Sequence, residues 1–344
     1  MIVRAEGDTN NFTLFRLLLS LAVVLGHFKL LSGTQYPHFP SNLADAAVFC
    51  FFVVSGYLIA LSYARTRGLW SFYVRRFFRL YPMYACIVLI QTGIMLTLLP
   101  GGPFSEVHDT VRYLVVNLAF ANFLQYDIGG VLHGLRVPGI NPSLWTLKIE
   151  LGFYLIVPLV FLAIRRWGFK SLVAIFIASA AYQAVALHLG DPRFAKQLPG
   201  QLQFFVVGMA LYLYVPNFRV PAWVSAVVTV GFLAAWTWLT PLQPVLCPLL
   251  VGAFVFCFTL CTPVVHMRTD MSYSVYLVHG PLLQTLLLLG LFHDTPWFML
   301  GVVAVVLMLS FLAEHLVERP GNEFGRRLSV RLAPPRPVRV ATAA

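Results

Sequence analysis

The chain alternates between long apolar stretches and short polar connections over most of its length. Ten of the apolar stretches approach the 20 or so residues that a helix needs to cross the hydrocarbon core of a bilayer. Because a chain in lipid must satisfy its own backbone hydrogen bonds, such runs predict an all-α polytopic membrane helical bundle. The predicted transmembrane helices cover residues 12–31, 46–64, 80–99, 144–164, 171–189, 200–215, 222–240, 244–261, 272–290 and 296–316.

One further apolar stretch, residues 112–125, is too short to span a membrane and contains Asn117, Asn122 and Gln125. Counting it as a span would give eleven crossings and place the basic loop 165–170 on the outside. With ten crossings and a cytoplasmic N-terminus, 17 of the 24 lysines and arginines lie inside and five outside. The positive-inside rule therefore favours ten transmembrane helices with both termini cytoplasmic, and 112–125 as a re-entrant or interfacial helix.

The composition agrees with a membrane protein and excludes a separate soluble domain. Of the 344 residues, 59% are hydrophobic and 11% charged, against about 25% charged in a soluble domain. The basic residues that give the net charge of +11 are distributed as the predicted membrane topology requires. We therefore expect a bilayer and no nucleic acid as partner. We expect an integral-membrane domain at 1–320, located in the inner (cytoplasmic) membrane, and a disordered basic cytoplasmic tail at 321–344. The five cysteines show no metal-binding spacing, so no metal site is expected.

The first predicted helix carries two polar residues that are costly at membrane depth, Arg16 and His27. They are eleven residues apart, which places them on one helix face about 16 Å apart along the axis. Anchoring of either residue at a membrane interface is the alternative to a functional role. A shared face favours a site that uses a cation and a titratable base together.

Three other predicted helices contain candidate residues. Glu150 lies at a depth comparable to His27, and a His–Glu pair would orient the imidazole as the carboxylate does in hydrolytic triads. A structural network around Glu150 is the alternative. His279 precedes Gly280 and Pro281, a local break that could free backbone groups, although such a histidine is more often structural. Ser55 is followed by Gly56, and small residues at this depth usually indicate close helix packing.

An arginine cluster, Arg75, Arg76 and Arg79, lies among aromatic residues in the predicted cytoplasmic loop before the third helix. The spacing brings Arg79 near both of the others on one side of a helix. Guanidinium groups bind phosphate with two hydrogen bonds in fixed geometry. The cluster therefore suits a phosphate ligand, and anchoring at the inner membrane surface is the equally weighted alternative.

Taken together, these stretches resemble the acyltransferase-3 family of bacterial integral-membrane acyltransferases. The matching motifs occur in the family's order: Arg16-x10-His27, FFVVSGYLI at 51–59, RRFFRLYP at 75–82, SLWTLKIELGFYL at 143–155, SYSVYLVHGPL at 272–282 and ERP at 318–320. The resemblance implies an enzyme that moves an acyl group, acetyl by default, from cytoplasmic acyl-CoA to a hydroxyl of an extracytoplasmic carbohydrate. Lipopolysaccharide, another surface polysaccharide, peptidoglycan and a lipid-linked glycan remain open as acceptors.

The resemblance also implies roles for individual residues. His27 is the main catalytic candidate with Glu150, and Arg16 supports the donor site. Arg76 and Arg79 match the family's R-x-x-R pair and would bind CoA phosphates with Arg75 beside them. Further candidates are Ser55, Ser143, Trp145 and His279.

Acyl-CoA enters as a donor substrate, and no permanently bound cofactor is expected. Direct transfer and an acyl-enzyme on His27 both fit the sequence. Because no extracytoplasmic esterase-like domain follows the last predicted helix, a second transfer step would need another protein. A transporter or flippase is the alternative function, since it would also place polar residues along a membrane pathway. A sensor or scaffold without activity is a further alternative.

Overall fold

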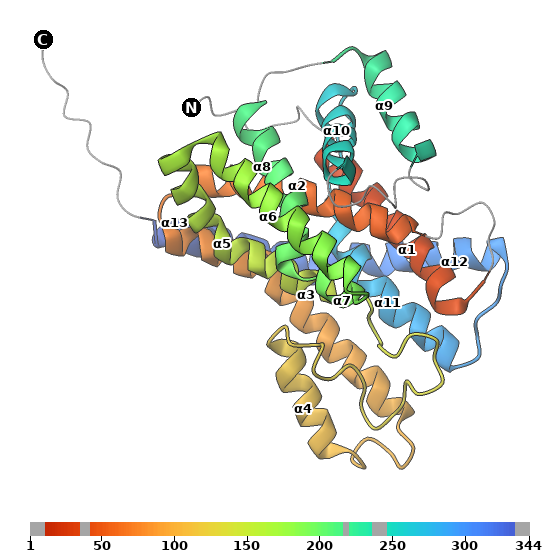
Figure 1. Cartoon of the computed structure of the whole chain (residues 1–344). Coiled ribbons are helices and arrows are strands. Elements are labelled where there is room, and N and C mark those ends of the chain that lie inside the picture. Colours follow the sequence, from red (N-terminus) through yellow and green to blue (C-terminus); the bar gives the residue numbers. More distant parts are fainter. Residues whose placement is uncertain (1–10, 35–41, 216–219, 236–245, 334–344) are drawn as a thin grey trace, which may run out of the picture.

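The structure, a computed structural model, describes residues 11–34, 42–215, 220–235 and 246–333, and these residues form helices and loops without a strand. Figure 1 shows the helices as one bundle, with α4 and the adjoining end of α3 projecting from it. The helices are α1 (Phe12–Ser32), α2 (Leu43–Arg65), α3 (Leu69–Leu98), α4 (Val107–Leu118), α5 (Trp145–Trp167), α6 (Phe169–His188), α7 (Pro192–Ala195), α8 (Leu198–Tyr214), α9 (Ala222–Ala235), α10 (Leu246–Cys261), α11 (Ser272–Leu288), α12 (Pro296–Ala313), the π-helical turn η2 (Glu314–Glu318) and α13 (Arg319–Arg331).

The predicted membrane helical bundle is confirmed as a fold class. Each predicted transmembrane stretch coincides with a helix, and six helices of the described residues are long and apolar enough to cross a membrane. Within the described residues, helices α8, α9, α10 and α11 have 14 to 17 residues and are shorter than that. Residues 236–240 and 244–245 of two predicted stretches lie outside the described residues. The count of ten crossings and the sidedness of the termini therefore remain predictions.

Helix α3 begins earlier than expected. The arginine cluster, predicted to lie in a loop, occupies the first half of a single 30-residue helix that continues through Pro82. The stretch contains no glycine or proline before Pro82, so no residue of low helix propensity interrupts the helix there. Arg75, Arg76 and Arg79 are therefore held by a rigid element of the bundle.

The last helix runs further than expected. α12, η2 and α13 form one continuous helical stretch from Pro296 to Arg331, about 54 Å long. The predicted disordered tail from residue 321 was wrong for its first part, because α13 packs along α3 with Gly321 and Gly325 close to the side chains of Pro82 and Phe78. Residues 334–344 of that tail lie outside the described residues.

The predicted short helix is present as α4. Its 12 residues span about 18 Å, too little to cross the hydrocarbon core, as expected. The buried face of α4 packs on α3, where the amide of Gln91 donates to the Tyr113 hydroxyl at 2.6 Å and Tyr84 donates to the Asn117 carbonyl at 2.5 Å. Whether α4 is re-entrant or interfacial is not decided by this packing.

Close contact between α2 and α8 confirms the expectation of tight helix packing at Gly56. A side chain at Gly56 would overlap the backbone carbonyl of Phe205, and one at Gly208 would overlap that of Val53. Small residues allow two helix backbones to approach in this way. The two glycines thus fix α2 against the bundle with Ser55 facing an internal cavity.

Candidate active site

The two histidines singled out in the sequence lie against each other. Nδ1 of His27, on α1, is 2.8 Å from Nε2 of His279, on α11. Both rings are buried, with 8% of His27 and 0% of His279 exposed. The membrane helices thus bring together two imidazoles that are 252 positions apart in the chain.

Hydrogen bonding defines the tautomers of this histidine pair. Nδ1 of His279 is 3.0 Å from the carbonyl oxygen of Val275, which can only accept, so this nitrogen carries the proton. In a neutral His279, Nε2 is therefore the acceptor, and His27 donates to it from Nδ1. This leaves Nε2 of His27 without a proton and able to take one, as a general base must.

A proline and an asparagine fix His279 within α11. Pro281 has no N–H to give the Leu277 carbonyl one turn earlier. The side-chain amide of Asn141 donates to that carbonyl instead, at 2.9 Å, and packs where a side chain at Gly280 would stand. The expected local break at Gly280–Pro281 therefore exists, and it joins the loop before α5 to α11 beside His279.

Ser143 and Trp145 lie near the start of α5, and Ser143 reaches the histidine pair. The Ser143 hydroxyl lies 3.4 Å from Nε2 of His279, a longer contact than that of His27. Trp145 packs edge-on against Phe52, and the Lys196 ammonium lies 5.4 Å from its ring centroid. Ser143 is thus next to the pair, whereas Trp145 faces the chain between α7 and α8.

The expected pairing of His27 with Glu150 was wrong, because His279 is the hydrogen-bond partner of His27 in the described structure. Glu150 instead accepts a hydrogen bond from Tyr154 one turn later, at 2.6 Å. Comparable depth in the membrane does not determine the hydrogen-bond partner of His27, because the direction in which each side chain points also depends on the rotation of its helix. Glu150 belongs to a neighbouring cavity.

That cavity has a volume of about 90 Å³ and is lined by side chains from five helices. Its polar lining consists of Arg16, Ser55, Arg76, Arg79, Thr146, Glu150, Tyr154, Ser272, Tyr273 and Tyr276. Three of these are arginines and one is a carboxylate, which makes the cavity wall predominantly cationic. Five residues that the sequence offered as candidates therefore line one cavity: Arg16, Ser55, Arg76, Arg79 and Glu150.

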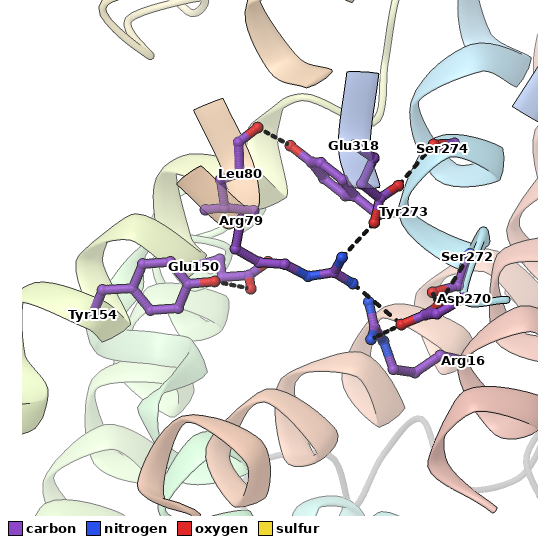
Figure 2. A network of polar contacts seen from close by, with 10 residues as sticks. All are labelled: Arg16, Arg79, Leu80, Glu150, Tyr154, Asp270, Ser272, Tyr273, Ser274 and Glu318. Carbon is purple, nitrogen blue, oxygen red and sulfur yellow. Dashed lines mark hydrogen bonds and ion pairs between the residues drawn. The ribbon is translucent and has the colours of Figure 1, made fainter. Parts of the chain in front are cut away.

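Two of the three arginines are already paired with carboxylates (Figure 2). Oδ2 of Asp270 forms ion pairs with Nη1 of Arg16 at 2.6 Å and with Nη2 of Arg79 at 3.2 Å. Arg79 also donates to Glu318, whose other oxygen accepts from Ser274 at 2.7 Å. This ion network ties α1, α3, α11 and the helical stretch after α12 to one another.

Asp270 lies in the segment between α10 and α11, outside the membrane-spanning helices. Burial alone would raise the pKa of its carboxyl group. The guanidinium groups of Arg16 and Arg79, together with hydrogen bonds from Ser272, outweigh burial and lower the pKa to about 2. Asp270 is therefore ionised over the whole physiological range and holds both arginines.

Arg76 differs from its neighbours in the cluster. It makes no ion pair within the described residues, and its Nε is buried without a hydrogen-bond partner. Its guanidinium carbon lies 5.7 Å from the Tyr154 ring centroid, on the cavity wall. Arg75 faces Thr66 at 3.4 Å and does not line this cavity. Among the clustered arginines, Arg76 thus has the most unused hydrogen-bonding capacity.

Sequence reasoning did not identify Asp270, Glu318, Tyr276 and Thr146 as parts of the site. Glu318 carried a signal, because it is an acidic residue at the end of an apolar run and inside the ERP motif. Asp270 looked like an ordinary loop residue. The hydroxyl groups of Tyr276 and Thr146 carried none, since either residue is common in membrane helices.

The fold and the site define a polytopic helical membrane protein with a buried histidine pair beside an arginine-lined cavity. The chain belongs to the acyltransferase-3 family, whose acyltransferase domain matches residues 9–315. The family predicted from the motifs is thereby confirmed.

Three relatives cover most of the chain. Nodulation protein 10 of Rhizobium leguminosarum bv. viciae is 26% identical over 95% of this chain and 98% of its own length. An O-acetyl transferase of Shigella phage Sf6 is 28% identical over 90% of this chain and 95% of its own. Acyltransferase MdmB of Streptomyces mycarofaciens is 27% identical over 88% of this chain and 87% of its own. No solved structure matches the chain.

The family and these relatives show that the protein is a membrane enzyme, an O-acyltransferase. This confirms the enzyme prediction over the transporter and scaffold alternatives.

Proposed function

We propose that the protein transfers an acyl group, acetyl in the first instance, from cytoplasmic acyl-CoA to a hydroxyl of an extracytoplasmic carbohydrate. The single observation that carries this proposal is the hydrogen-bond chain from Val275 through His279 to His27. It leaves one imidazole nitrogen free to accept a proton in a buried position, next to a cationic cavity. A base and a cation-lined cavity are what this transfer requires.

In the proposed reaction, Nε2 of His27 takes the proton from the acceptor hydroxyl. The oxygen attacks the thioester carbonyl, the carbon–sulfur bond breaks, and the proton passes to the departing CoA sulfur. The products are an ester and free CoA. His279 does not touch the substrate in this scheme but holds His27 in the required tautomer.

The donor would enter from the side of Arg76. The positive-inside distribution of basic residues places the first turns of α3 in the cytoplasm, where acyl-CoA is made. Arg76, which lacks an ion pair within the described residues, is the arginine best suited to a CoA phosphate, whereas Arg16 and Arg79 already have carboxylate partners. Arg76 would therefore bind the donor directly, and Arg79 would shape the cavity through the ion network.

The ten-helix topology gives the transfer its direction. With both termini cytoplasmic, Arg16 lies toward the inner side of α1 and His27 toward the outer side, about 16 Å away along the helix. The enzyme would thus carry an acyl group across about half of the hydrocarbon core of the inner membrane, which is about 30 Å thick. A lipopolysaccharide, another surface polysaccharide, peptidoglycan or a lipid-linked glycan would receive it, with an additional extracytoplasmic protein where a second transfer follows.

The test uses the purified protein in liposomes with labelled acetyl-CoA supplied on one side. We expect His27→Ala to abolish transfer, a loss of about 100- to 10,000-fold for a general base, while CoA still protects the protein against thermal unfolding. Transfer at the wild-type rate by His27→Ala would overturn the proposal. Label that stays on the wild-type protein without acceptor would indicate an acyl-enzyme in place of direct transfer.

A further inference from the structure

The arginine-lined cavity ends before it reaches the histidine pair. Thr146 of α5 and Tyr276 of α11 line the cavity, and neither His27 nor His279 is among the described residues that do. The Tyr276 ring centroid is 6.2 Å from that of His279, which lies one helical turn further along α11. Tyr276 thus contacts the cavity and lies beside the histidine pair.

Hydrogen bonds hold Tyr276 in this position. The Thr146 hydroxyl donates to the Ser143 carbonyl at 2.9 Å and lies 2.8 Å from the Tyr276 hydroxyl, which is also 3.4 Å from that carbonyl. The Tyr276 ring also packs edge-on against Phe51, another residue of the cavity wall. These hydroxyl contacts and the aromatic contact hold the ring on the cavity wall beside His279.

We propose that Tyr276, held by Thr146, determines which acyl groups the enzyme transfers, by limiting the size of the group that can reach His27. This inference rests on the proposed function, because it requires the donor to occupy the cavity. An acetyl group passes the ring with the smallest displacement of Tyr276. Each additional methylene must displace the ring further from Thr146 and Phe51 in a closely packed interior, and larger acyl groups are excluded for that reason.

The experiment compares acetyl-CoA with butyryl-CoA as donors for the protein in liposomes. We expect Tyr276→Ala to raise the ratio of kcat/KM for butyryl over acetyl at least about tenfold, since one methylene in a fitted pocket changes discrimination by about 10- to 200-fold. Tyr276→Phe removes the hydroxyl contacts to both Thr146 and Ser143, whereas Thr146→Val removes only the contact to Thr146. Each should raise the ratio by a smaller factor than Tyr276→Ala, and the double variant should raise it no further than Tyr276→Phe alone.

Tyr273→Phe is the matched control, because Tyr273 lines the same cavity one turn earlier but donates to the Leu80 carbonyl at 2.9 Å. Its donor ratio should equal that of the wild type. An unchanged ratio in an active Tyr276→Ala protein overturns the inference. Where that variant does not fold, unchanged ratios in both Tyr276→Phe and Thr146→Val overturn it.

Binding of CoA and the activity of His27→Ala are measured on the same preparations. If CoA does not bind the wild type, or His27→Ala remains active, the proposed function fails whatever the donor ratio is. If both behave as proposed and the ratio does not move in the Tyr276 variants, only size selection by Tyr276 fails. The two proposals are thus judged by separate readouts.

Discussion

Nδ1 of His27 and Nε2 of His279 are 2.8 Å apart, and the direction of this hydrogen bond determines which nitrogen of His27 can act as a base. His279 accepts because its other nitrogen donates to Val275. An imidazole in this role needs a partner that accepts a hydrogen bond, and a neutral histidine can accept one through its unprotonated nitrogen. His279 is therefore a positioning residue for His27.

The first prediction concerns substitutions of His279. His279→Ala removes the acceptor for His27 and should lower kcat about 100-fold, as expected for a misplaced reacting group, with little change in KM for acyl-CoA. His279→Gln offers a side-chain carbonyl at a similar distance and should retain more activity than His279→Ala. Steady-state kinetics in liposomes measures both. Equal loss in the two variants would contradict a role for His279 as hydrogen-bond acceptor.

The second prediction concerns the carbonyl of Leu277, which Pro281 leaves without its helical partner. Asn141→Ala should destabilise the protein by about 1–3 kcal/mol, because a buried carbonyl loses its only donor. Adding Pro281→Ala restores a backbone N–H at position 281, which can donate to the Leu277 carbonyl. The double variant should therefore recover part of the lost stability. Thermal unfolding in detergent measures the stability of both variants.

Pro281→Ala alone is the control for this pair and should be neutral or slightly stabilising, since it adds a helical hydrogen bond. A double variant no more stable than Asn141→Ala would show that the bond from Asn141 to Leu277 is not what stabilises this junction.

Much of the fold could be predicted because membrane depth imposes a length on each helix. Each apolar run that was predicted to span the membrane coincides with a helix. The cost of polar side chains in lipid identified Arg16, His27 and His279 as candidate functional residues. The partner of His27 could not be predicted in this way. Glu150 and His279 both lie at a suitable depth, and only the packing of α1 against α11 decides which of them His27 contacts.

The ends of helices were the least predictable part. The run from Leu69 to Leu80 reads as a basic loop, yet it is helical, with α13 packed along it and Glu318 of η2 paired with Arg79. That contact joins residues 239 positions apart, which no local pattern encodes. The functional difference between Arg76 and Arg79 follows from this long-range contact and not from their spacing.

The third prediction separates these two arginines. Arg76→Ala should raise KM for acyl-CoA about tenfold with little change in melting temperature, because Arg76 makes no ion pair within the described residues. Arg79→Ala should lower the melting temperature strongly, since it leaves the buried Glu318 without a cation and Asp270 with Arg16 alone. The expected loss is about 3–5 kcal/mol, as for a broken buried pair. Donor kinetics and thermal unfolding of each variant test this.

A double variant and a pH series control the interpretation of Arg79→Ala. Glu318→Gln added to it should recover part of the stability, because the unpaired charge is removed. Asp270, with its pKa lowered from 3.8 to about 2, stabilises the folded state above about pH 4 and loses that effect as the pH falls toward 2. In the Glu318→Gln background, where the carboxylate of Glu318 cannot take up a proton, the stability difference caused by Arg79→Ala should therefore be constant from pH 8 to pH 5. A difference that vanishes within this range would contradict the ion network.

The fourth prediction concerns the contact between α2 and α8, which holds Ser55 on the cavity wall. Gly56→Ala and Gly208→Ala each place a methyl group against a backbone carbonyl of the facing helix, which cannot turn aside as a side chain can. Each should destabilise the protein by about 1–3 kcal/mol and reduce activity by moving α2. Gly301→Ala, in α12, meets no atom within 4 Å and should be neutral or slightly stabilising, as expected for alanine in a helix. Melting temperatures of Gly56→Ala and Gly208→Ala equal to that of Gly301→Ala would mean that the two helices do not approach this closely.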